Sequence, residues 1–454
     1  MSFVVEPRVM NVDLTSPGAL PDDDAEAGPL NAGLAKLPLL PALLVVAVLL
    51  PEELYLQVGG LFLTLPRVLL LVAFPLLLVR TIRQATRPGF HASISDYAIF
   101  PLSIWMFLAV AVSQGFTRAM VGSSALILDF AGSYLVMRTI ANEPGAAVAV
   151  ARFMAGALAV AALLGPLDHL FGQYAIHRIG DMLTHLGRDL DPEFRHGLMR
   201  ARGAQEHSIL LGSISSFGAI LSLSVFRGVP RWIAVICCLA GLFSAVSSAP
   251  ILATLMGFGL LFFRRQTPHF PSRWLALGVT GGSVALLVFT LHPSPFAFIF
   301  QHFTLDPQTS WYRLVIWQVA GSLVLANPLF GIGLDDWARE AWMPSTVDSV
   351  WLRSAMMFGI VGSALIAVVV IGACSRPLRV SGREELPLAE QSLGVGLGII
   401  TFLIAYLGFT VHFWGCTWFM MGMFAGLRAH LGGLAADQPS LDDLDFTFAD
   451  DEDA

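Results

Sequence analysis

The sequence predicts an all-α membrane protein with about twelve transmembrane helices and two long loops on one face. Three observations lead to this prediction: the composition, a series of apolar stretches and the placement of arginine. Of 454 residues, 56% are hydrophobic and only 13% are charged. This apolar share exceeds that of an ordinary soluble domain, and the charge is too sparse to cover a soluble surface. The composition therefore favours the lipid bilayer as the solvent.

The negative charge of the chain lies mainly in its two tails. The formal net charge is -7, and acidic residues cluster at 22–26 and again at 442–453. Both tails are polar and would bury too little apolar area to offset the entropy lost on ordering. We therefore predict disordered cytoplasmic tails at 1–36 and 431–454, on either side of one transmembrane domain at 37–430. We expect no removable signal peptide, because no basic segment followed by an apolar one begins the chain.

Apolar stretches long enough to cross, or nearly cross, about 30 Å of hydrocarbon recur throughout the transmembrane domain. They lie at 37–50, 58–79, 97–112, 119–137, 146–171, 208–226, 232–246, 251–263, 274–291, 350–372, 392–411 and 413–430. The segment from 232 to 263 is too long for one straight helix. Polar residues and a helix-breaking proline, Pro250, interrupt it at 247–250. We predict a tight helical hairpin there.

The arginines predict the orientation of the chain. With a cytoplasmic N-terminus, the short external connections carry only Arg118. The cytoplasmic connections carry Arg80, Arg83, Arg87, Arg138, Arg227, Arg231, Arg264, Arg265, Arg273, Arg376, Arg379 and Arg383. Because basic residues favour the cytoplasmic side, both termini are expected there, and the long loops 172–207 and 292–349 are expected outside. Apolar residues at three- and four-residue intervals over 171–190 predict an amphipathic helix at the membrane surface.

The first long loop ends in a charged motif. Residues 198–208 read LMRARGAQEHS, directly before an apolar stretch. This places Arg200, Arg202, Glu206 and His207 at the outer boundary of the membrane. External arginines run against the general charge bias, so they require a reason.

The second long loop contains three further motifs. It reads SWYRLVIW at 310–317, NPLFGIGLDDW at 327–337 and STVDSVWL at 345–352. Planar guanidinium groups bind phosphate through two parallel hydrogen bonds. Glycines such as Gly331 and Gly333 allow backbone amides to approach a ligand closely. The two loops together favour a site for an anionic headgroup on a lipid tail.

These motifs resemble the O-antigen ligase and Wzy polymerase superfamily, especially its exopolysaccharide-polymerase branch. The resemblance runs from about Arg200 to about Gly362, and the order of the spans is compatible over most of the remainder. It implies a membrane glycosyltransferase of the GT-C type, which acts externally on glycans linked to undecaprenyl or another polyprenyl diphosphate. Many ligases have a His-Asn pair where this chain has Asp348-Ser349, which resembles the polymerase branch instead.

We therefore predict a bacterial inner-membrane enzyme that polymerises lipid-linked repeat units into a cell-surface polysaccharide or exopolysaccharide, with its active face in the periplasm. Arg313, with Arg200 and Arg202, is expected to stabilise charge on the departing diphosphate. Asp348 or Glu206 is expected to act as the base for the acceptor hydroxyl. The predicted substrate-binding residues are Arg200, Arg202, His207, Gly331, Gly333, Trp317 and Trp351.

The predicted partners are the lipid-linked oligosaccharide donor, a glycan acceptor, membrane lipid and possible other exopolysaccharide assembly proteins, with no nucleic acid. We expect no cofactor and no metal. His169, His177 and His185 are spaced by eight residues, which turns each about 80° around a helix from the last and argues against a shared metal-binding face.

Structural interpretations stay open for these residues. External arginines can pair with lipid phosphates, and Asp348 can cap the helix that follows it. The glycines can merely shape a turn, and the tryptophans can anchor the chain at the membrane interface. Two other functions also stay open: ligation of O-antigen glycan to the lipid A core, and transport or flipping of a lipid-linked glycan. A transporter would have functional charges near the middle of the membrane, whereas the charges here lie at its boundary.

Overall fold

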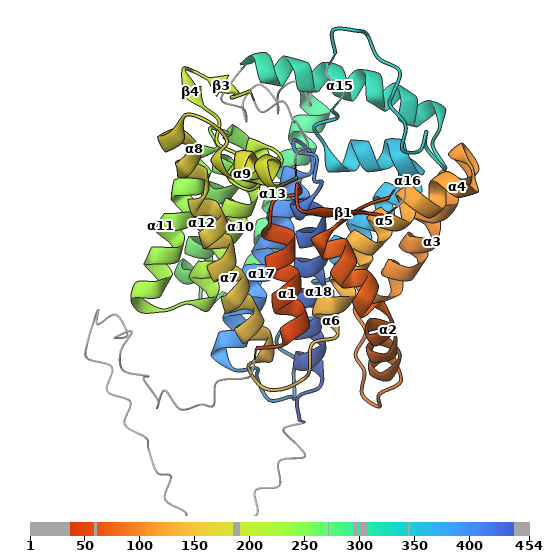
Figure 1. Ribbon diagram of the computed structural model, residues 1–454. Helices are drawn as coiled ribbons and strands as arrows, with labels where there is room; N and C mark the ends of the chain where they lie inside the picture. The colour runs from red at the N-terminus through yellow and green to blue at the C-terminus, as the bar shows by residue number, and fades with distance from the viewer. Residues whose placement is uncertain are drawn as a thin grey trace, which may run out of the picture.

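The computed structural model describes residues 37–58, 61–184, 191–270, 272–294, 298, 307–343 and 346–439. Within these residues, helices run side by side in a bundle, and shorter elements cover one end of it (Figure 1). Residues 1–36 and 440–454, for which we predicted disordered tails, lie outside the described residues. The described part of the chain is mostly helical, which confirms the predicted all-α membrane fold.

The elements up to the first long loop form one side of the bundle and part of its centre (Figure 1). They are α1 (Leu39–Leu49), β1 (Tyr55–Val58), β2 (Leu61–Thr64), α2 (Leu65–Ala85), α3 (Ile94–Gln114), α4 (Phe116–Arg118), η1 (Ala119–Ser123), α5 (Ser124–Ile127), η2 (Leu128–Gly132), α6 (Ser133–Arg138), α7 (Ala146–Leu163) and α8 (Gly165–Phe171). The fourth predicted span is one continuous helical segment that contains the two π-helical turns η1 and η2.

The remaining elements complete the bundle and its covered end. They are α9 (Ala175–Thr184), β3 (Phe194–Arg195), β4 (Leu198–Met199), α10 (Ser208–Val225), α11 (Gly228–Ser244), α12 (Ser248–Gln266), α13 (Arg273–Leu291), α15 (Pro307–Ala326), α16 (Val350–Gly372), α17 (Leu388–Leu407) and α18 (Cys416–Ala436). Helix α10 lies at the centre, with 89% of its apolar segment buried, whereas none of the corresponding segment of α13 is buried. In a bilayer, α13 would therefore contact lipid all round.

Every apolar stretch predicted as a span contains a helix. Eight helices among the described residues are long and apolar enough to cross a membrane, and α1 and α11 are shorter apolar helices. The predicted hairpin is also present, because α11 ends at Ser244 and α12 begins at Ser248. The count of about twelve crossings stays a prediction.

Three predicted boundaries differ from the structure. Residue Val58 belongs to a strand that pairs antiparallel with β2, and the second helix begins only at Leu65, where Pro66 occupies its first turn. The amphipathic helix expected over 171–190 is divided by Gly172, whose φ is +64°. Its second part is α9, and residues 185–190 lie outside the described residues. Helix α18 continues to Ala436, beyond the predicted start of the C-terminal tail.

The two ends of the bundle carry different segments. Figure 1 shows α15 lying across one end, with β3 and β4 at that same end, which we call the loop end. At the other end, the arginine end, the predicted cytoplasmic connections meet one another. Arg87 Nη2 lies 3.7 Å from Asp437 Oδ2. Arg376 Nε donates to Ala92 O at 2.9 Å, and Arg383 Nη1 donates to Gln438 O at 2.6 Å. The long loops therefore share one end, opposite the arginine-bearing connections, as predicted.

Candidate active site

Asp168 in α8 fixes the backbone of the charged motif that ends the first loop. Its Oδ2 accepts hydrogen bonds from the backbone N–H groups of Arg202 and Gly203, each at 2.8 Å. Its Oδ1 accepts another from the N–H of Ala175 at 3.0 Å, which joins α9 to the same carboxylate. Gly203 has a φ of +59°, a conformation that suits glycine. Asp168 thus fixes the position of the backbone from which the neighbouring arginine side chains extend.

Glu193 gathers the arginines of this motif. Its Oε2 accepts from Arg200 Nη1 at 2.9 Å, and its Oε1 accepts from Arg202 Nη2 at 2.6 Å. The Arg202 guanidinium also lies over the Tyr174 ring, 4.3 Å from its centroid. His207 Nε2 is 3.9 Å from Glu193 Oε2. One carboxylate therefore faces two permanent cations and an imidazole.

The two arginines keep buried hydrogen-bond donors that no group within the described ranges accepts. These donors are Nε and Nη2 of Arg200 and Nε of Arg202. A buried guanidinium donor without an acceptor is unfavourable, so such donors are normally satisfied by a ligand or by water. The cluster is therefore suited to bind an anion with several oxygen atoms.

The local charges set the protonation of Glu193 and His207. Burial by itself would raise the pKa of Glu193, but the charges of Arg202 and Arg200 outweigh it and lower that pKa. Burial, followed by the charge of Arg200, lowers the pKa of His207 to about 4. His207 is therefore neutral at pH 7. Its Nδ1 accepts from the N–H of Ile209 at 3.1 Å, so the neutral ring carries its proton on Nε2.

Arg313 and Asp348 bring the second long loop to the same cluster. Arg313 lies on α15 and is only 4% exposed. Asp348 lies just before α16, and burial raises its pKa, against the opposing charges of Arg313 and then Arg200. Asp348 therefore lies within the electrostatic reach of one arginine from each loop. Asp348 thus interacts electrostatically with one arginine from each long loop, and a shared site for Arg200, Arg313 and Asp348 stays a prediction.

The cap of α16 is Ser349, so the structural interpretation of Asp348 as the cap is wrong. The Ser349 side chain accepts from the N–H of Leu352 at 3.2 Å and donates to Gly408 O at 2.8 Å. Asp348 interacts instead with Thr346 and with the two arginines. Its carboxylate is thus not used to begin the helix.

A break in α16 receives the turn that contains Gly331 and Gly333. Gly359, inside α16, has φ +74° and ψ 175°, which are not helical. The N–H of Ile332 donates to the Met356 carbonyl, which this break frees, at 2.7 Å. A Cβ atom at Gly331 would overlap the backbone of α16, so only glycine permits this approach. The geometry gives the turn a packing role, and ligand binding by Gly331 and Gly333 stays a prediction.

The predicted tryptophans pack on the connection between α17 and α18. The Trp317 ring stacks on Phe409 with centroids 6.3 Å apart. Trp351 Nε1 donates to Ala405 O at 3.0 Å, and its ring meets Phe409 edge-on. Sugar stacking by these two rings stays a prediction, because their described contacts are with protein.

Glu206 occupies a different place from Asp348. Its carboxylate lies against Gly415 at the start of α18, where a Cβ atom would overlap Oε1 of Glu206. It also interacts electrostatically with Arg67, which is bound to Asp129 at 2.7 Å. The two carboxylates that we considered as bases therefore lie in separate surroundings.

Several residues of this region were missed in the sequence, above all Glu193, Asp168 and a buried Glu53–His177 pair. His177 Nδ1 is 2.7 Å from Glu53 Oε1, and its Nε2 is 2.7 Å from Gln205 O. A carbonyl oxygen only accepts, so Nε2 carries a proton. The only sequence signal was that Asp168 and Glu53 stand at the ends of apolar stretches, and Glu193 had none.

Two more missed residues lie between α17 and α18. The His412 ring is 5.3 Å from the Trp414 ring, which in turn lies 5.9 Å from His207. Burial lowers the pKa of His412 to about 3, so this ring is neutral at pH 7. In the described part of the chain, no group of three or more His, Cys, Asp or Glu side chains is placed to hold a metal ion. His185 lies outside the described residues.

The comparison with protein families agrees with the resemblance noted in the motifs. Residues 233–367 match the family model described as O-antigen ligase. This segment includes Arg313, the Gly331 and Gly333 turn and Asp348, and it begins after the Arg200–His207 motif. No curated protein matches the chain. The resemblance to the O-antigen ligase and Wzy polymerase superfamily is thus confirmed over residues 233–367 of this multi-pass membrane protein.

Proposed function

We propose that this protein is a glycosyltransferase that joins polyprenyl-diphosphate-linked oligosaccharide repeat units into a longer glycan. The main support is the convergence of Arg200, from the first loop, and Arg313, from the second, beside the carboxylate of Asp348. Both loops come from the same end of the bundle (Figure 1). Cations for a diphosphate and a carboxylate for a hydroxyl are the two groups that this transfer requires.

The reaction follows from these charges. The bond between the anomeric carbon of the donor sugar and the diphosphate oxygen breaks, and the diphosphate leaves with the electron pair. An acceptor hydroxyl forms the new bond to that carbon and gives its proton to Asp348. Arg200, Arg202 and Arg313 neutralise the charge that develops on the diphosphate. Because burial raises the pKa of Asp348, its carboxylate is a stronger base than an ordinary aspartate.

Asp348 is preferred to Glu206 as the base because of their surroundings. The charges of Arg313 and Arg200 both reach Asp348, so a hydroxyl held there lies next to the proposed diphosphate site. Glu206 lies against Gly415 and interacts electrostatically with Arg67. We therefore assign proton transfer to Asp348 and return to Glu206 below.

The test uses the purified protein in liposomes with lipid-linked repeat units that accumulate in cells lacking it. We expect longer lipid-linked glycans to form without nucleotide and in the presence of a chelator, since arginines supply the positive charge. Asp348→Asn is the inactive control. Loss of extension on chelation, restored by a titrated divalent ion, would remove metal independence from the proposal. Glycan found only on added lipid A core would indicate a ligase, and movement of the unit without extension would indicate a flippase.

We also propose that the loop end faces the periplasm and the arginine end faces the cytoplasm. Ala338 and Ser381 are exposed at the loop end and the arginine end, respectively. In a chain without its native cysteines, Ala338→Cys should react with an impermeant maleimide in spheroplasts. Ser381→Cys should react only after permeabilisation. The reverse pattern would overturn the orientation without affecting the assigned chemistry.

A further inference from the structure

A cleft at the loop end lies beside the charged motif. It contains about 430 Å³ of space, part of it open to solvent. Its walls come from the end of α1 and the turn that follows, the start of α2, residues 204–206 and the start of α18. Residues 204–206 directly follow Arg202 and Gly203, so one short segment borders both the arginine cluster and the cleft.

Two polar atoms in this cleft are buried without a hydrogen-bond partner among the described residues. Gln205 is only 3% exposed, and its Nε2 is one of these atoms. The other is Oγ1 of Thr64, which precedes α2 but does not cap it. The backbone of Gln205 is held in place, because its carbonyl oxygen accepts from His177 Nε2 at 2.7 Å. The amide is therefore presented to the cleft by a fixed backbone.

The remaining lining is part apolar and part acidic. Val48, Leu65 and Phe419 provide apolar surface, and Glu52 and Glu206 provide carboxylates. A lipid tail would leave the buried amide and hydroxyl without hydrogen bonds. A phosphate would meet two carboxylates of the same sign, and the nearby Arg67 is already bound to Asp129 through two nitrogen atoms, at 2.7 and 3.0 Å. Neither ligand suits the cleft.

A neutral sugar suits every part of this lining. Its hydroxyl groups can donate to the carboxylates of Glu52 and Glu206 and accept from Gln205 Nε2. Its C–H face can lie on the apolar side chains, as in other small-molecule sites that combine apolar walls with a few polar groups. We propose that this cleft binds an uncharged sugar residue of the acceptor glycan. This inference rests on the proposed function and adds the acceptor's binding site to it.

The connection between α17 and α18 links this cleft to Asp348. The N–H of Val350, two residues after Asp348, donates to Val411 O at 3.0 Å. Four residues further along the same connection, Gly415 lines the cleft and lies against Glu206. The cleft is therefore an anchoring site next to the transfer site. Glu206 binds sugar hydroxyls within the cleft, and Asp348, outside the cleft, takes the proton of the acceptor hydroxyl.

The experiment measures protection of a cysteine in the cleft. Ala47 lines the cleft from α1, and Val46, its neighbour, is exposed outside it. Each is changed to cysteine in a full-length chain whose native cysteines are replaced, and the rate of maleimide labelling is measured. The acceptor probe is the oligosaccharide released by mild acid from accumulated lipid-linked units, which carries no diphosphate. Inorganic pyrophosphate and polyprenol are the other two probes.

We expect the oligosaccharide, at ten times its Kd, to slow labelling of Ala47→Cys about tenfold. Val46→Cys should be unaffected, and neither pyrophosphate nor polyprenol should protect Ala47→Cys. Adding Gln205→Leu should raise the Kd of the oligosaccharide about tenfold, since one buried hydrogen bond is lost, so the same concentration should slow labelling only about twofold. If that variant does not fold, Thr64→Val serves instead. Its matched control is Thr290→Val, because Thr290 is exposed and bonds only within its own helix.

Three results would overturn the inference: protection by pyrophosphate, protection by polyprenol, or no protection by the oligosaccharide. The assay requires no turnover, so its failure differs from failure of the proposed function. Protection without glycan extension would support the cleft as a sugar site and contradict the proposed polymerase activity. If glycan extension is unchanged in Gln205→Leu and Thr64→Val and no protection is seen, the cleft is not the acceptor site. The proposed polymerase activity would then stand.

Discussion

Two sets of buried arginines, one at each end of the bundle, are paired in different ways. At the arginine end, Arg138 forms one closed pair with Asp96, whereas at the loop end Arg200 and Arg202 share Glu193. Both sets are partly or fully buried. Arg138 is 42 residues from Asp96 in the sequence, whereas Arg200 and Arg202 are 7 and 9 residues from Glu193. The difference is in how many donors each set leaves unused.

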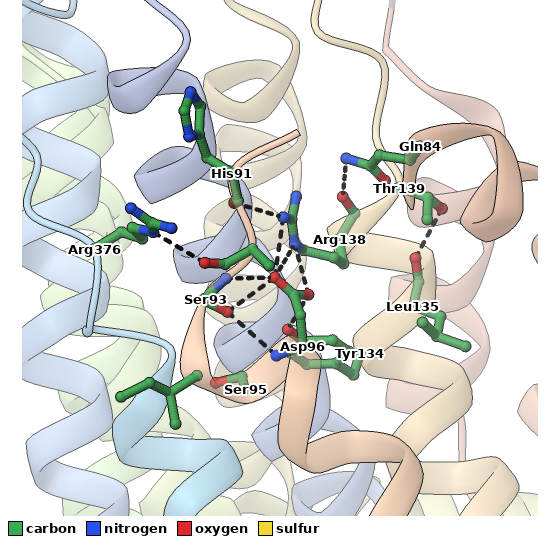
Figure 2. Close-up of polar contacts among 12 residues, drawn as sticks. Gln84, His91, Ser93, Ser95, Asp96, Tyr134, Leu135, Arg138, Thr139 and Arg376 are labelled. Carbon is green, nitrogen blue, oxygen red and sulfur yellow. Dashed lines mark hydrogen bonds and ion pairs between the residues drawn. The ribbon is translucent and has the colours of Figure 1, made fainter. Parts of the chain in front are cut away.

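At the arginine end, the carboxylate of Asp96 accepts hydrogen bonds from two segments, α6 and the residue that precedes α3. Arg138 Nε donates to Oδ1 at 2.8 Å, and its Nη2 donates to Oδ2 at 3.0 Å and to His91 O at 3.3 Å. The Tyr134 hydroxyl and the Ser93 N–H each donate to the same carboxylate at 2.7 Å. Figure 2 shows these groups converging on Asp96. One cation and one anion are balanced here.

In the loop-end cluster, two arginines share the one carboxylate of Glu193, and three guanidinium nitrogens have no acceptor among the described residues. A balanced buried pair is therefore no sign of a binding site, because its groups satisfy one another. A buried surplus of one sign indicates a ligand of the opposite sign. Four predictions follow from this contrast, from the largest expected effect to the smallest.

Removal of Arg138 should cost more stability than removal of Arg202. Arg138→Gln leaves Asp96 buried without its cation, which typically costs about 3–5 kcal/mol of the free energy of unfolding. Arg202→Gln relieves part of a positive surplus and should cost much less. Denaturant unfolding of both variants in the same detergent gives the comparison. Equal losses would show that the two ends do not differ in the way described.

Asp348→Asn should slow transfer about 100-fold or more, because the base is lost while size and hydrogen bonding are kept. Binding of the lipid-linked donor, measured separately at matched protein abundance, should persist. Stability should also persist, since Ser349 caps α16. In the native protein, transfer should fall as the pH drops through the raised pKa of Asp348, because only the ionised form accepts a proton. Near-normal extension by the variant would remove Asp348 from proton transfer.

Arg313→Lys should impair transfer markedly although the charge is kept. Lysine lacks the planar fork that binds a phosphate through two hydrogen bonds, so a loss of about tenfold in donor affinity is expected. The control is Arg80→Lys in α2, at the arginine end of the bundle. The Arg80 side chain is exposed, and no phosphate contact is proposed for it. Unchanged donor affinity and activity in Arg313→Lys would separate Arg313 from the diphosphate site.

The smallest effect should be a pH dependence in how firmly α9 is held. Burial would lower the pKa of His177, but its hydrogen bond to Glu53 and the charge of Glu53 raise it overall. A raised folded-state pKa gives stability that is complete below the unfolded value near 6.5 and is lost as the pH rises through the folded value. Protease protection of α9 should therefore decrease with rising pH. His177→Gln should abolish that dependence, and an unchanged profile would argue against it.

The sequence determined the helical bundle and part of the site. Apolar stretches become helices because lipid offers no hydrogen bonds to the backbone, so the backbone N–H and C=O groups of each stretch must bond to one another. Arginine placement distinguished the two ends, because charged residues avoid the hydrocarbon and basic residues favour the cytoplasmic side. The motifs likewise indicated Arg200, Arg202, Arg313 and Asp348 before any contact between them was known.

Only the tertiary structure decided which groups meet. Glu193, Asp168 and Glu53 lie outside the recognised motifs. Glu193 meets Arg200 across the β3–β4 hairpin, and Asp168 and Glu53 bind residues 35 and 124 positions away in the chain. The break at Gly359 depends on a turn that docks from the second loop, and the choice of Ser349 as the cap depends on side-chain direction. Such contacts have no period in the sequence. They arise only when separate helices pack, because packing sets the distances on which hydrogen bonds and charge interactions depend.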